Sequence, residues 1–413
     1  MSSDKSNAGK SAPLYTPLSG RVILLGVSGG IAVFKAAAYA RNLVHLGARV
    51  ITVMTANAQN FVTPLTFAAL TSERVHTDTF ETYDAHSIPH IALAREADLM
   101  LLVPATANII AKAANGLADD LLSTLYLAFS GPAVFCPAMN PLMYSHPATQ
   151  ENMASLTERG HTVVDAGFGD TVCGEKGQGR LAGWQYVREA VIKALTKQSL
   201  KGVRVLVTAG PTREAIDPVR FLSNRSSGKM GYAVAIEAMR RGGEVTLVTG
   251  PCSLSMPCGM NVVPVTSASD MASAVEEHAS DADIVIMAAA VADYTPSDVK
   301  KTKIKKDQDA FTLTLQKTRD ILAGLLENRR PGQVITGFCA ETGDLEERAM
   351  EKIRKKPVDL LVANDVTEQG AGFDVDTNRV MLIDRDHNIE KLPLLSKEEV
   401  AVRIMNRVEA FIR

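Results

Sequence analysis

The sequence predicts an α/β chain that contains two doubly wound, Rossmann-like domains in tandem. Two stretches carry this prediction, because each runs from an apolar strand through a glycine-containing loop into a helix: residues 21–46 and residues 203–241. A second apolar strand follows each of them, at 48–54 and at 244–248, which completes a βαβ unit. The loop and helix N-terminus of such a unit offer free backbone N–H groups to an anion. We therefore expect two phosphate- or nucleotide-binding units in one chain.

Composition narrows the class of protein. The length of 413 residues suggests two or three domains, and the net charge of −2 argues against a nucleic-acid or membrane-surface partner. Apolar runs stay well short of the ~20 residues of a membrane-spanning helix. The five cysteines form no CxxC pair, which argues against a disulfide scaffold or a zinc site and favours the cytoplasm. Residues 1–19 are rich in Ser, Lys, Pro and Gly and are expected to form a disordered tail.

The first βαβ unit departs from the dinucleotide-binding pattern. Its loop reads GVSGG in place of GxGxxG, and its second strand ends at Met54-Thr55 without a carboxylate for a ribose hydroxyl. A smaller phosphate-bearing cofactor such as FMN fits better, although the glycines could simply form a tight turn. The cofactor-binding residues predicted here and at the next strand end are Ser28, Gly29, Gly30, Thr55, Pro104, Ala105, Thr106 and Asn108.

Three residues of the first half are candidates for catalysis. His90 precedes an apolar helical run and is the commonest acid or base near neutral pH, although it could be structural. Asn140 follows an apolar strand and could bind a carboxylate, or could be a turn residue. Cys173 lies in the polar, glycine-rich stretch DTVCGEKGQGR, where it could donate a proton from a mobile flap or be an incidental exposed thiol.

Taken in order, GVSGGIAVFK, His90, PATAN, PAMNPLM and VCGEKGQGR resemble the flavin-dependent cysteine decarboxylases, and among them the phosphopantothenoylcysteine decarboxylases. The resemblance covers residues 20–190 and implies a flavodoxin-like flavoprotein domain that binds FMN. It also implies that His90, Asn140 and Cys173 are catalytic, with Met143 beside the substrate. Oxidation of the substrate thiol would precede loss of CO₂, and Cys173 would supply a proton. The family forms trimers with FMN between subunits, so one protomer is not expected to complete the site.

The second half carries a further series of strand-end motifs. Asp293 follows a buried strand, at a position where it could bind a ribose, a base or a metal-bound water. The run KKTKIKK at residues 300–306 could neutralise a triphosphate, or could be a solvated surface. We also expect a β segment at 311–315 and a helix that begins near Thr318, with Thr318 as its N-cap.

The motifs TAGPTRE, DPVRFLSNRSSGKMG, AAAVADY, KIKK, GFCAET and DLLVAND resemble phosphopantothenoylcysteine synthetase over residues 200–410. The resemblance implies that Asn224 stabilises an acyl-cytidylate intermediate. It implies CTP as co-substrate with Mg²⁺, although no carboxylate cluster identifies the metal ligands. Pro357 and Val172 depart slightly from the pattern. The implied CTP-binding residues are Met287, Ala288, Ala289, Asp293, Lys303, Arg319, Asp320, Ile321, Leu322, Phe338, Lys352 and Lys356.

The whole chain thus resembles the bacterial bifunctional coenzyme A biosynthesis family, with a tail at 1–19, a decarboxylase domain at 20–198 and a ligase domain at 199–413. The implied substrates are 4′-phosphopantothenate, cysteine and CTP. The implied assembly joins trimers of the first half and dimers of the second half into a dodecamer, without nucleic acid or membrane. Two alternatives remain: a related flavin protein, such as a flavin prenyltransferase, with an unrelated second half, and a non-enzymatic nucleotide sensor.

Overall fold

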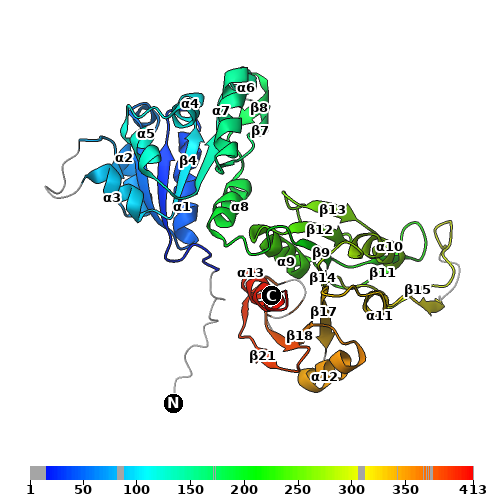
Figure 1. Ribbon diagram of the computed structural model, residues 1–413. Helices are drawn as coiled ribbons and strands as arrows, with labels where there is room; N and C mark the ends of the chain where they lie inside the picture. Colours follow the sequence, from blue (N-terminus) through cyan, green and yellow to red (C-terminus); the bar gives the residue numbers. More distant parts are fainter. Residues whose placement is uncertain are drawn as a thin grey trace, which may run out of the picture. The chain divides into compact units, whose positions relative to one another are not determined.

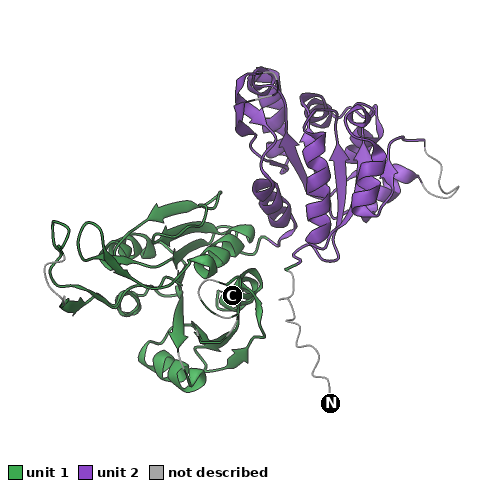
Figure 2. Cartoon of the chain, turned by 180° about the vertical axis from the view of Figure 1, so that it is seen from behind, with its two compact units in different colours: residues 1–15, 198–413 green, residues 16–197 purple. Residues whose placement is uncertain are grey.

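The computed structural model describes residues 15–80, 88–170, 172, 174–305, 312–341, 343–365, 367–368, 370, 372 and 375–412. The chain divides into two compact units (Figure 2), with the division between Lys197 and Gln198. Residues 16–197 form the N-terminal unit, and residues from 198 onward form the C-terminal unit. Each unit is built on its own sheet, with a hydrophobic core on either face.

The N-terminal unit contains a six-stranded parallel sheet of order β3-β2-β1-β4-β5-β6. The predicted doubly wound class is confirmed. This strand order is the Rossmann order, however, whereas a flavodoxin-like sheet has the order 2-1-3-4-5. The difference is a single edge strand of two residues, β3: without it the order β2-β1-β4-β5-β6 is that of a flavodoxin-like sheet, so the predicted flavoprotein fold is confirmed with one added edge strand. The strands are β1 (Val22–Val27), β2 (Arg49–Met54), β3 (Val75–His76), β4 (Leu99–Ala105), β5 (Ala133–Pro137) and β6 (Thr162–Val163).

Helices cover both faces of this sheet (Figure 1). One core lies under α1 (Val33–His45), α2 (Pro64–Thr71) and α8 (Trp184–Leu195). The opposite core lies under α3 (Pro89–Glu96), α4 (Ala107–Asn115), α5 (Leu121–Ala128) and α7 (Pro147–Glu158). Burial on both faces explains the continuous apolar runs of β1 and β4. The short elements η1 (Ala58–Asn60) and α6 (Pro141–Ser145) and the hairpin of β7 (Gly167–Asp170) and β8 (Lys176–Arg180) complete the unit.

The C-terminal unit contains an eight-stranded mixed sheet of order β13-β12-β9-β14-β17-β18-β20-β21. The strands are parallel from β13 to β18, and β20 and β21 are antiparallel additions. The four strands at the β13 edge are β13 (Asn261–Pro264), β12 (Glu244–Thr249), β9 (Arg204–Ala209) and β14 (Ile284–Met287). The other four are β17 (Val334–Glu341), β18 (Leu360–Asp365), β20 (Val380–Asp384) and β21 (Ile389–Lys391).

Helices also cover both faces of the second sheet, and short two-stranded ladders lie outside it. One core contains α9 (Lys229–Arg240) and α13 (Lys397–Ala410), and the other contains α10 (Ala268–Ala279), α11 (Ile321–Glu327) and α12 (Leu345–Lys355). Three two-stranded ladders lie outside the main sheet. They are β10 (Arg213–Ala215) with β11 (Phe221–Ser223), β15 (Tyr294–Pro296) with β16 (Leu315–Lys317), and β19 (Thr377–Asn378) with β22 (Leu395–Ser396).

Two local predictions in the C-terminal unit are wrong. The strand expected at 311–315 is β16, which begins at Leu315; residue 311 lies outside the described residues. The helix expected near Thr318 is α11, and its N-cap is Asp320, whose carboxylate accepts a hydrogen bond from the backbone N–H of Ala323 at 3.0 Å. The hydroxyl of Thr318 instead donates to the carbonyl of Ala292 at 2.6 Å. That contact holds Thr318 to the segment after β14, and the N-cap lies two residues later than predicted.

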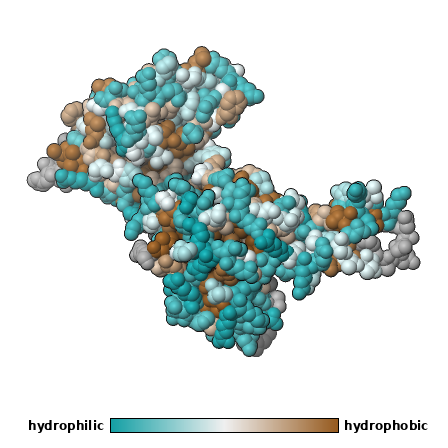
Figure 3. All heavy atoms as spheres, turned by 45° about the vertical axis from the view of Figure 1, so that its right-hand side comes forward, coloured by the Kyte–Doolittle hydropathy of each residue, from teal (hydrophilic) through white to brown (hydrophobic). Residues whose placement is uncertain are grey.

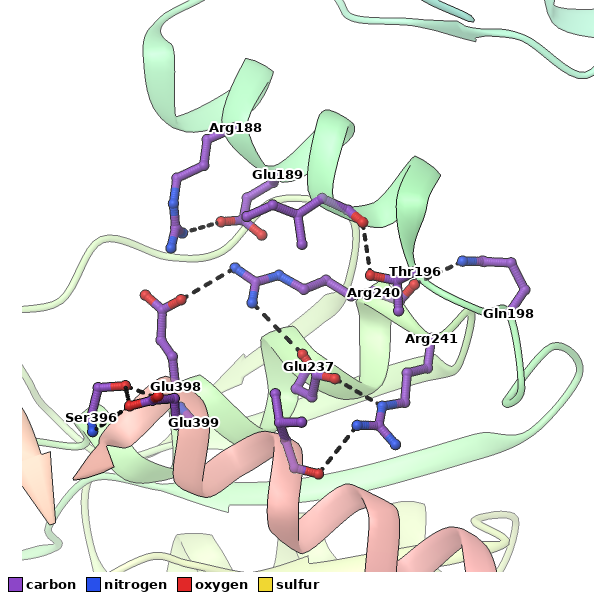
Figure 4. Close-up of polar contacts among 12 residues, drawn as sticks. Arg188, Glu189, Thr196, Gln198, Glu237, Arg240, Arg241, Ser396, Glu398 and Glu399 are labelled. Atoms are coloured by element: carbon purple, nitrogen blue, oxygen red, sulfur yellow. Dashed lines mark hydrogen bonds and ion pairs between the residues drawn. The ribbon is translucent and has the colours of Figure 1, made fainter. Parts of the chain in front are cut away.

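A buried cluster of charges links α9 to α13 (Figure 4). The carboxylate of Glu237 accepts a hydrogen bond from Arg241 Nε at 2.8 Å and lies 3.7 Å from Arg240. Arg241 also pairs with Glu409 on α13 at 3.0 Å, and Arg240 lies 3.6 Å from Glu398. Such pairs fix geometry more than they add stability, because desolvation offsets much of their attraction. The cluster therefore sets the position of α13 against α9.

Among the described residues, no helix is long and apolar enough to cross a membrane.

Candidate active sites

The N-terminal unit has a cavity of about 900 Å³ at the carboxyl ends of its strands. Ligands of open α/β sheets bind at this edge. Eight of the residues predicted from the sequence line the cavity together, although they come from four separate parts of the chain. They are Ser28, Gly29, Gly30, Thr55, Thr106, Asn108, Asn140 and Met143.

The β1–α1 loop is held against the end of β4. Ser28 Oγ donates to the carbonyl of Pro104 at 2.7 Å and accepts from the backbone N–H of Thr106 at 3.0 Å. Pro104 and Ala105 are not part of the cavity lining; the carbonyl of Pro104 holds Ser28, and the carbonyl of Ala105 accepts from the backbone N–H of Ala138 at 3.0 Å. Gly29 lies so close to Asn57 that an added Cβ would come within 2.7 Å of the Asn57 carbonyl carbon. Glycine is required there for close packing of the loop.

Asn140 lies where the β7–β8 hairpin meets the PAMN loop. Its side-chain oxygen accepts from the backbone N–H of Leu142 at 2.8 Å and caps α6, while its Nδ2 donates to Glu175. The backbone N–H of Met139 donates to the carbonyl of Gly179 at 2.9 Å. Gly179 has φ +152°, and an added Cβ would meet the Met139 oxygen at 2.4 Å. The hairpin therefore packs on the PAMN loop through a position that requires glycine.

The other two catalytic candidates of this half are placed differently. Cys173 lies outside the described residues, but Asp170 and Val172 of the same stretch line the cavity. His90 lies in the first turn of α3 and is absent from the cavity lining. Its Nδ1 is buried and has no hydrogen-bond partner among the described residues. One protomer therefore brings Asn140, but not His90, to this cavity.

The sequence prediction missed several polar residues of this cavity. Lys112 on α4 forms ion pairs with Asp119 at 2.6 Å and Asp120 at 2.7 Å, and both Lys112 and Asp120 line the cavity. Burial would raise the pKa of Asp120, but hydrogen bonds from Lys112 and Ser123 outweigh it and hold the pKa below its usual range. Lys35 and Arg180 also contribute positive charge. Asp120 and Ser123 form a capping box at the start of α5. The Asp-x-x-Ser spacing is the sequence pattern from which Asp120 could have been placed at a helix start.

The C-terminal unit has a second cavity, of about 870 Å³, at the carboxyl edge of its own sheet. All but one of the residues predicted to bind CTP line it, and Asn224 lines it as well. The exception is Lys303, which is exposed and is not part of the cavity lining. Its loop is bound to residues 217–220 instead. The neighbouring Ile304 receives a hydrogen bond from Arg220 at 3.0 Å and donates one to Asp217 at 3.1 Å. The lining residues predicted for CTP are Met287, Ala288, Ala289, Asp293, Arg319, Asp320, Ile321, Leu322, Phe338, Lys352 and Lys356.

The segment that follows β14 is fixed from the β9 side of the cavity. The hydroxyl of Thr208 accepts from the backbone N–H of Ala289 at 3.1 Å, and that of Thr212 accepts from Ala292 at 3.0 Å. Asn224 Nδ2 donates to the carbonyls of Ala290 at 3.0 Å and Val291 at 3.2 Å. Because both of these partners are carbonyl oxygens, they orient the amide of Asn224. The TAGPT loop and Asn224 thus hold residues 289–292 in one conformation at the edge of the cavity.

Positive charge predominates in the second cavity. Among the described residues that line it, seven are lysine or arginine, whereas two, Asp293 and Asp320, are acidic. Burial would raise the pKa of Asp320, but hydrogen bonds from Lys356 and from the backbone of Ala323 outweigh it and lower the pKa. Even with both carboxylates ionised, the seven basic side chains leave the cavity with a strong excess of positive charge. Such a cavity suits a polyphosphate.

Other lining residues of this cavity were not predicted. Asn378 in β19 and Lys397 at the start of α13 line it, together with Lys229 and Lys317. None of these four belongs to a recognisable spacing, except that Lys229 directly follows the NRSSG motif. Across the described part of the chain, no group of three or more His, Cys, Asp and Glu side chains is placed to hold a metal ion.

Comparison with known proteins covers both halves of the chain. A family model described as flavoprotein matches residues 11–196, and one described as DNA/pantothenate metabolism flavoprotein C-terminal domain matches residues 200–412. The chain is 46% identical over 397 residues to the coenzyme A biosynthesis bifunctional protein CoaBC of Bacillus subtilis, which covers 95% of this chain and 98% of that one. It is 43% identical over 406 residues to CoaBC of Mycobacterium tuberculosis, covering 94% and 96%.

A solved structure of the C-terminal domain of a CoaBC protein is similar at 43% identity, with a TM-score of 0.45, and covers 52% of this chain and 98% of that chain. Because both halves match family models, a flavin protein with an unrelated second half is not supported. The predicted pair of activities, phosphopantothenoylcysteine decarboxylase and phosphopantothenate–cysteine ligase, is confirmed by the full-length relatives. The chain belongs to the CoaBC family of bifunctional coenzyme A biosynthesis proteins.

Proposed function

We propose that residues 199–413 couple 4′-phosphopantothenate to cysteine at the expense of CTP, and that residues 20–198 decarboxylate the product with FMN. The observation that carries this proposal is the pair of cavities, each at the carboxyl edge of its own sheet and each lined by most of the residues predicted for its half. The two reactions are consecutive, so the product of the C-terminal half is the substrate of the N-terminal half.

The first cavity fits FMN. The hydroxyl oxygen of Thr55 is buried and has no hydrogen-bond partner among the described residues, although Thr55 lines the cavity. A cofactor with a phosphate, a ribityl chain and a ring system offers donors and acceptors to such a group, and the β1–α1 loop offers backbone N–H groups to the phosphate. When bound, FMN supplies the oxidation of the substrate thiol that makes loss of CO₂ feasible. Asn140 would orient the substrate carboxylate, and Cys173 would donate a proton.

Replacing Thr55 by valine is expected to weaken FMN binding about tenfold, because a buried polar contact to the cofactor is lost. Thr52 is a matched control, since it lies in β2 three residues before Thr55, is fully buried and has a hydroxyl without a partner among the described residues, but is not part of the cavity lining. The Thr52→Val variant should bind FMN as the parent protein does. Titration of flavin fluorescence measures both affinities. Equal FMN affinity in Thr55→Val and the parent would remove Thr55 from the cofactor site.

The second cavity fits a Mg²⁺–nucleotide complex. Seven lysine and arginine side chains line it, and Asp293 supplies a carboxylate at the strand end. Protein sites commonly hold Mg²⁺ with one or two carboxylates together with substrate phosphates, so the lack of a larger carboxylate cluster among the described residues suits an ion that enters with CTP. The lysines would offset charge on the triphosphate while the pantothenate carboxylate attacks the α-phosphate. Pyrophosphate leaves, and an acyl-cytidylate forms.

Nucleotide choice provides a direct test of the ligase half. With 4′-phosphopantothenate and Mg²⁺ but without cysteine, CTP should give a burst of pyrophosphate close to one per ligase site, because the acyl-cytidylate forms and accumulates. ATP at the same concentration should give at least about tenfold less, which is the discrimination expected when hydrogen bonds to the base are lost. A coupled pyrophosphate assay measures both. A burst of equal size with ATP would contradict the assignment of CTP.

We further propose that both sites are completed by self-association, through trimers of the N-terminal half and dimers of the C-terminal half in a dodecamer, in the cytoplasm. His90 and Lys303 support this, because each lies outside the cavity to which its predicted role belongs. Apolar patches interrupt the polar surface in Figure 3. Large apolar side chains that are exposed in the N-terminal unit include Ile31, Phe34, Leu65, Ile88 and Leu142. Such surfaces are typical of subunit interfaces.

A further inference from the structure

One part of the ligase cavity is lined by two buried polar residues that the predicted CTP contacts do not include. Asn378 is 5% exposed and Lys397 is 6% exposed, and both line the cavity. They are brought together by the short β19–β22 ladder, in which Asn378 lies opposite Leu395, two residues before Lys397. The backbone N–H of Lys397 also donates to the carbonyl of Asp376 at 2.9 Å. The two side chains are thus anchored to one small piece of backbone at the edge of the cavity.

Burial and the helix dipole oppose the charge of Lys397, although the exposed carboxylate of Asp376 lies near enough for the two charges to interact. Lys397 is the first residue of α13, where the positive end of the helix dipole lies, and its side chain is almost completely buried. The helix start is firmly set, because Ser396 and Glu399 form a capping box that Figure 4 shows at the head of α13. The ammonium group donates to the carbonyl of Gly372 at 3.3 Å. A buried ammonium at a helix N-terminus that faces a cavity is well suited to an anionic ligand group.

Asn378 requires a hydrogen-bond donor from the ligand, whereas Lys397 requires an anion. Its side-chain oxygen is buried and has no hydrogen-bond partner among the described residues. An amide oxygen accepts hydrogen bonds, so its missing partner must be a donor. Phosphate groups are acceptors at neutral pH and do not meet this requirement. A ligand that satisfies both residues therefore carries an anion and an N–H or O–H donor close together.

We propose that Lys397 and Asn378 form the subsite for the α-amino acid that the ligase couples, with the carboxylate of cysteine on Lys397 and its amino group on the Asn378 oxygen. The inference rests on the proposed function, and it assigns cysteine, the amino-acid substrate of the ligase, to this part of the cavity. The other two substrates reach the remainder of the cavity, where Asn224 and the predicted CTP residues lie. Among the substrates, cysteine is the one whose anion and donor are attached to the same carbon.

This placement gives Asn378 a part in orienting the nucleophile. The neutral amine donates one N–H to Asn378 and keeps its lone pair for the acyl carbon of the acyl-cytidylate. The N–C bond forms, the bond from the acyl carbon to the phosphate oxygen breaks, and CMP leaves with that electron pair. The nitrogen releases one proton, so the products are the amide, CMP and a proton. Lys397 makes no bond to a reacting atom and serves to hold the carboxylate.

The test compares substrates rather than total activity. In the full-length protein, Lys397→Gln is expected to raise KM for cysteine about 10- to 100-fold, the effect of losing a charged hydrogen bond, while KM for CTP and for 4′-phosphopantothenate changes less than about twofold. The pyrophosphate burst without cysteine should be retained. Lys355→Gln is the matched control, because Lys355 is exposed, pairs with Glu351 and is outside the cavity lining. It should leave all three KM values unchanged.

Cysteamine, which is cysteine without its carboxylate, separates the two roles. The parent enzyme should prefer cysteine strongly, Lys397→Gln should lose most of that preference, and Lys397→Arg should recover part of it. Asn378→Leu should lower kcat/KM for cysteine and cysteamine by a similar factor, because both amines lose the same acceptor.

A rise in KM for phosphopantothenate or CTP with unchanged KM for cysteine would overturn the proposal and assign Lys397 to a phosphate. Unchanged KM values and an unchanged preference in Lys397→Gln would also overturn it. A parent enzyme that gave no pyrophosphate burst would instead reject the proposed ligase function, so the two failures are distinguishable.

Discussion

Replacing Cys173 by serine is expected to lower the rate of CO₂ release about 100- to 10,000-fold, the range associated with loss of a general acid. A hydroxyl is a far weaker acid than a thiol, so a protonation step that depends on Cys173 slows even though the size of the side chain hardly changes. The flanking residues Asp170 and Val172 line the N-terminal cavity, which supports the proposed role of Cys173. Release of ¹⁴CO₂ from phosphopantothenoyl-[carboxyl-¹⁴C]cysteine measures the effect.

The ligase reaction provides an internal control for this variant. CMP formation by Cys173→Ser should match that of the parent protein, because the ligase cavity lies in the other unit. Cys258→Ser is a matched substitution at an exposed cysteine of the C-terminal unit and should leave CO₂ release unchanged. Decarboxylation at the parental rate in Cys173→Ser would show that another group donates the proton.

Replacing Asn224 by aspartate is expected to lower ligase turnover at least about 100-fold. The amide nitrogen of Asn224 donates to the carbonyls of Ala290 and Val291, so aspartate would place a carboxylate against two carbonyl oxygens. Loss of two hydrogen bonds together with this repulsion corresponds to about 3 kcal/mol. Residues 289–292 would then shift at the edge of the cavity, and the acyl-cytidylate would form poorly or lose its stabilisation. Quenched-flow measurement of pyrophosphate and CMP separates these two effects.

A second aspartate substitution controls for added charge. Asn261 is exposed in the edge strand β13 and is not part of the ligase cavity lining, so Asn261→Asp should retain full ligase turnover. Decarboxylation of supplied phosphopantothenoylcysteine should stay normal in both variants. If Asn224→Asp turns over at the parental rate, neither the proposed stabilising role nor the anchoring of residues 289–292 by this side chain matters for ligation.

Local sequence predicted those parts of the sites that follow directly from a strand end. Ser28, Thr106 and Asn140 each lie within a few residues of a buried apolar strand, and parallel strands end at one edge of a sheet. The same reasoning located Asp293 after β14. The strand order could not be predicted in the same way. The position of β3 beside β2 depends on the path of the chain between them and not on the periodicity of either strand.

Residues that depend on long-range packing could not be placed in advance. Asn378 lies in a strand of two residues, and its burial results from pairing with a segment near residue 395. The N-cap of α11 moved from Thr318 to Asp320 because Thr318 donates to the carbonyl of Ala292, 26 residues away in the chain. His90 and Lys303 were predicted from motifs that resemble those of the family. A motif does not show whether the residues of a cavity come from one chain or from two.

The central claim is that one chain makes an amide in its C-terminal half and decarboxylates the same product in its N-terminal half. The most direct measurement supplies 4′-phosphopantothenate, carboxyl-labelled cysteine, CTP and Mg²⁺ to the flavin-loaded protein and follows CMP and labelled CO₂ to completion. We predict one CO₂ for each CMP and no CO₂ when CTP is omitted. CMP without CO₂, or CO₂ released from cysteine in the absence of CTP, would contradict this account.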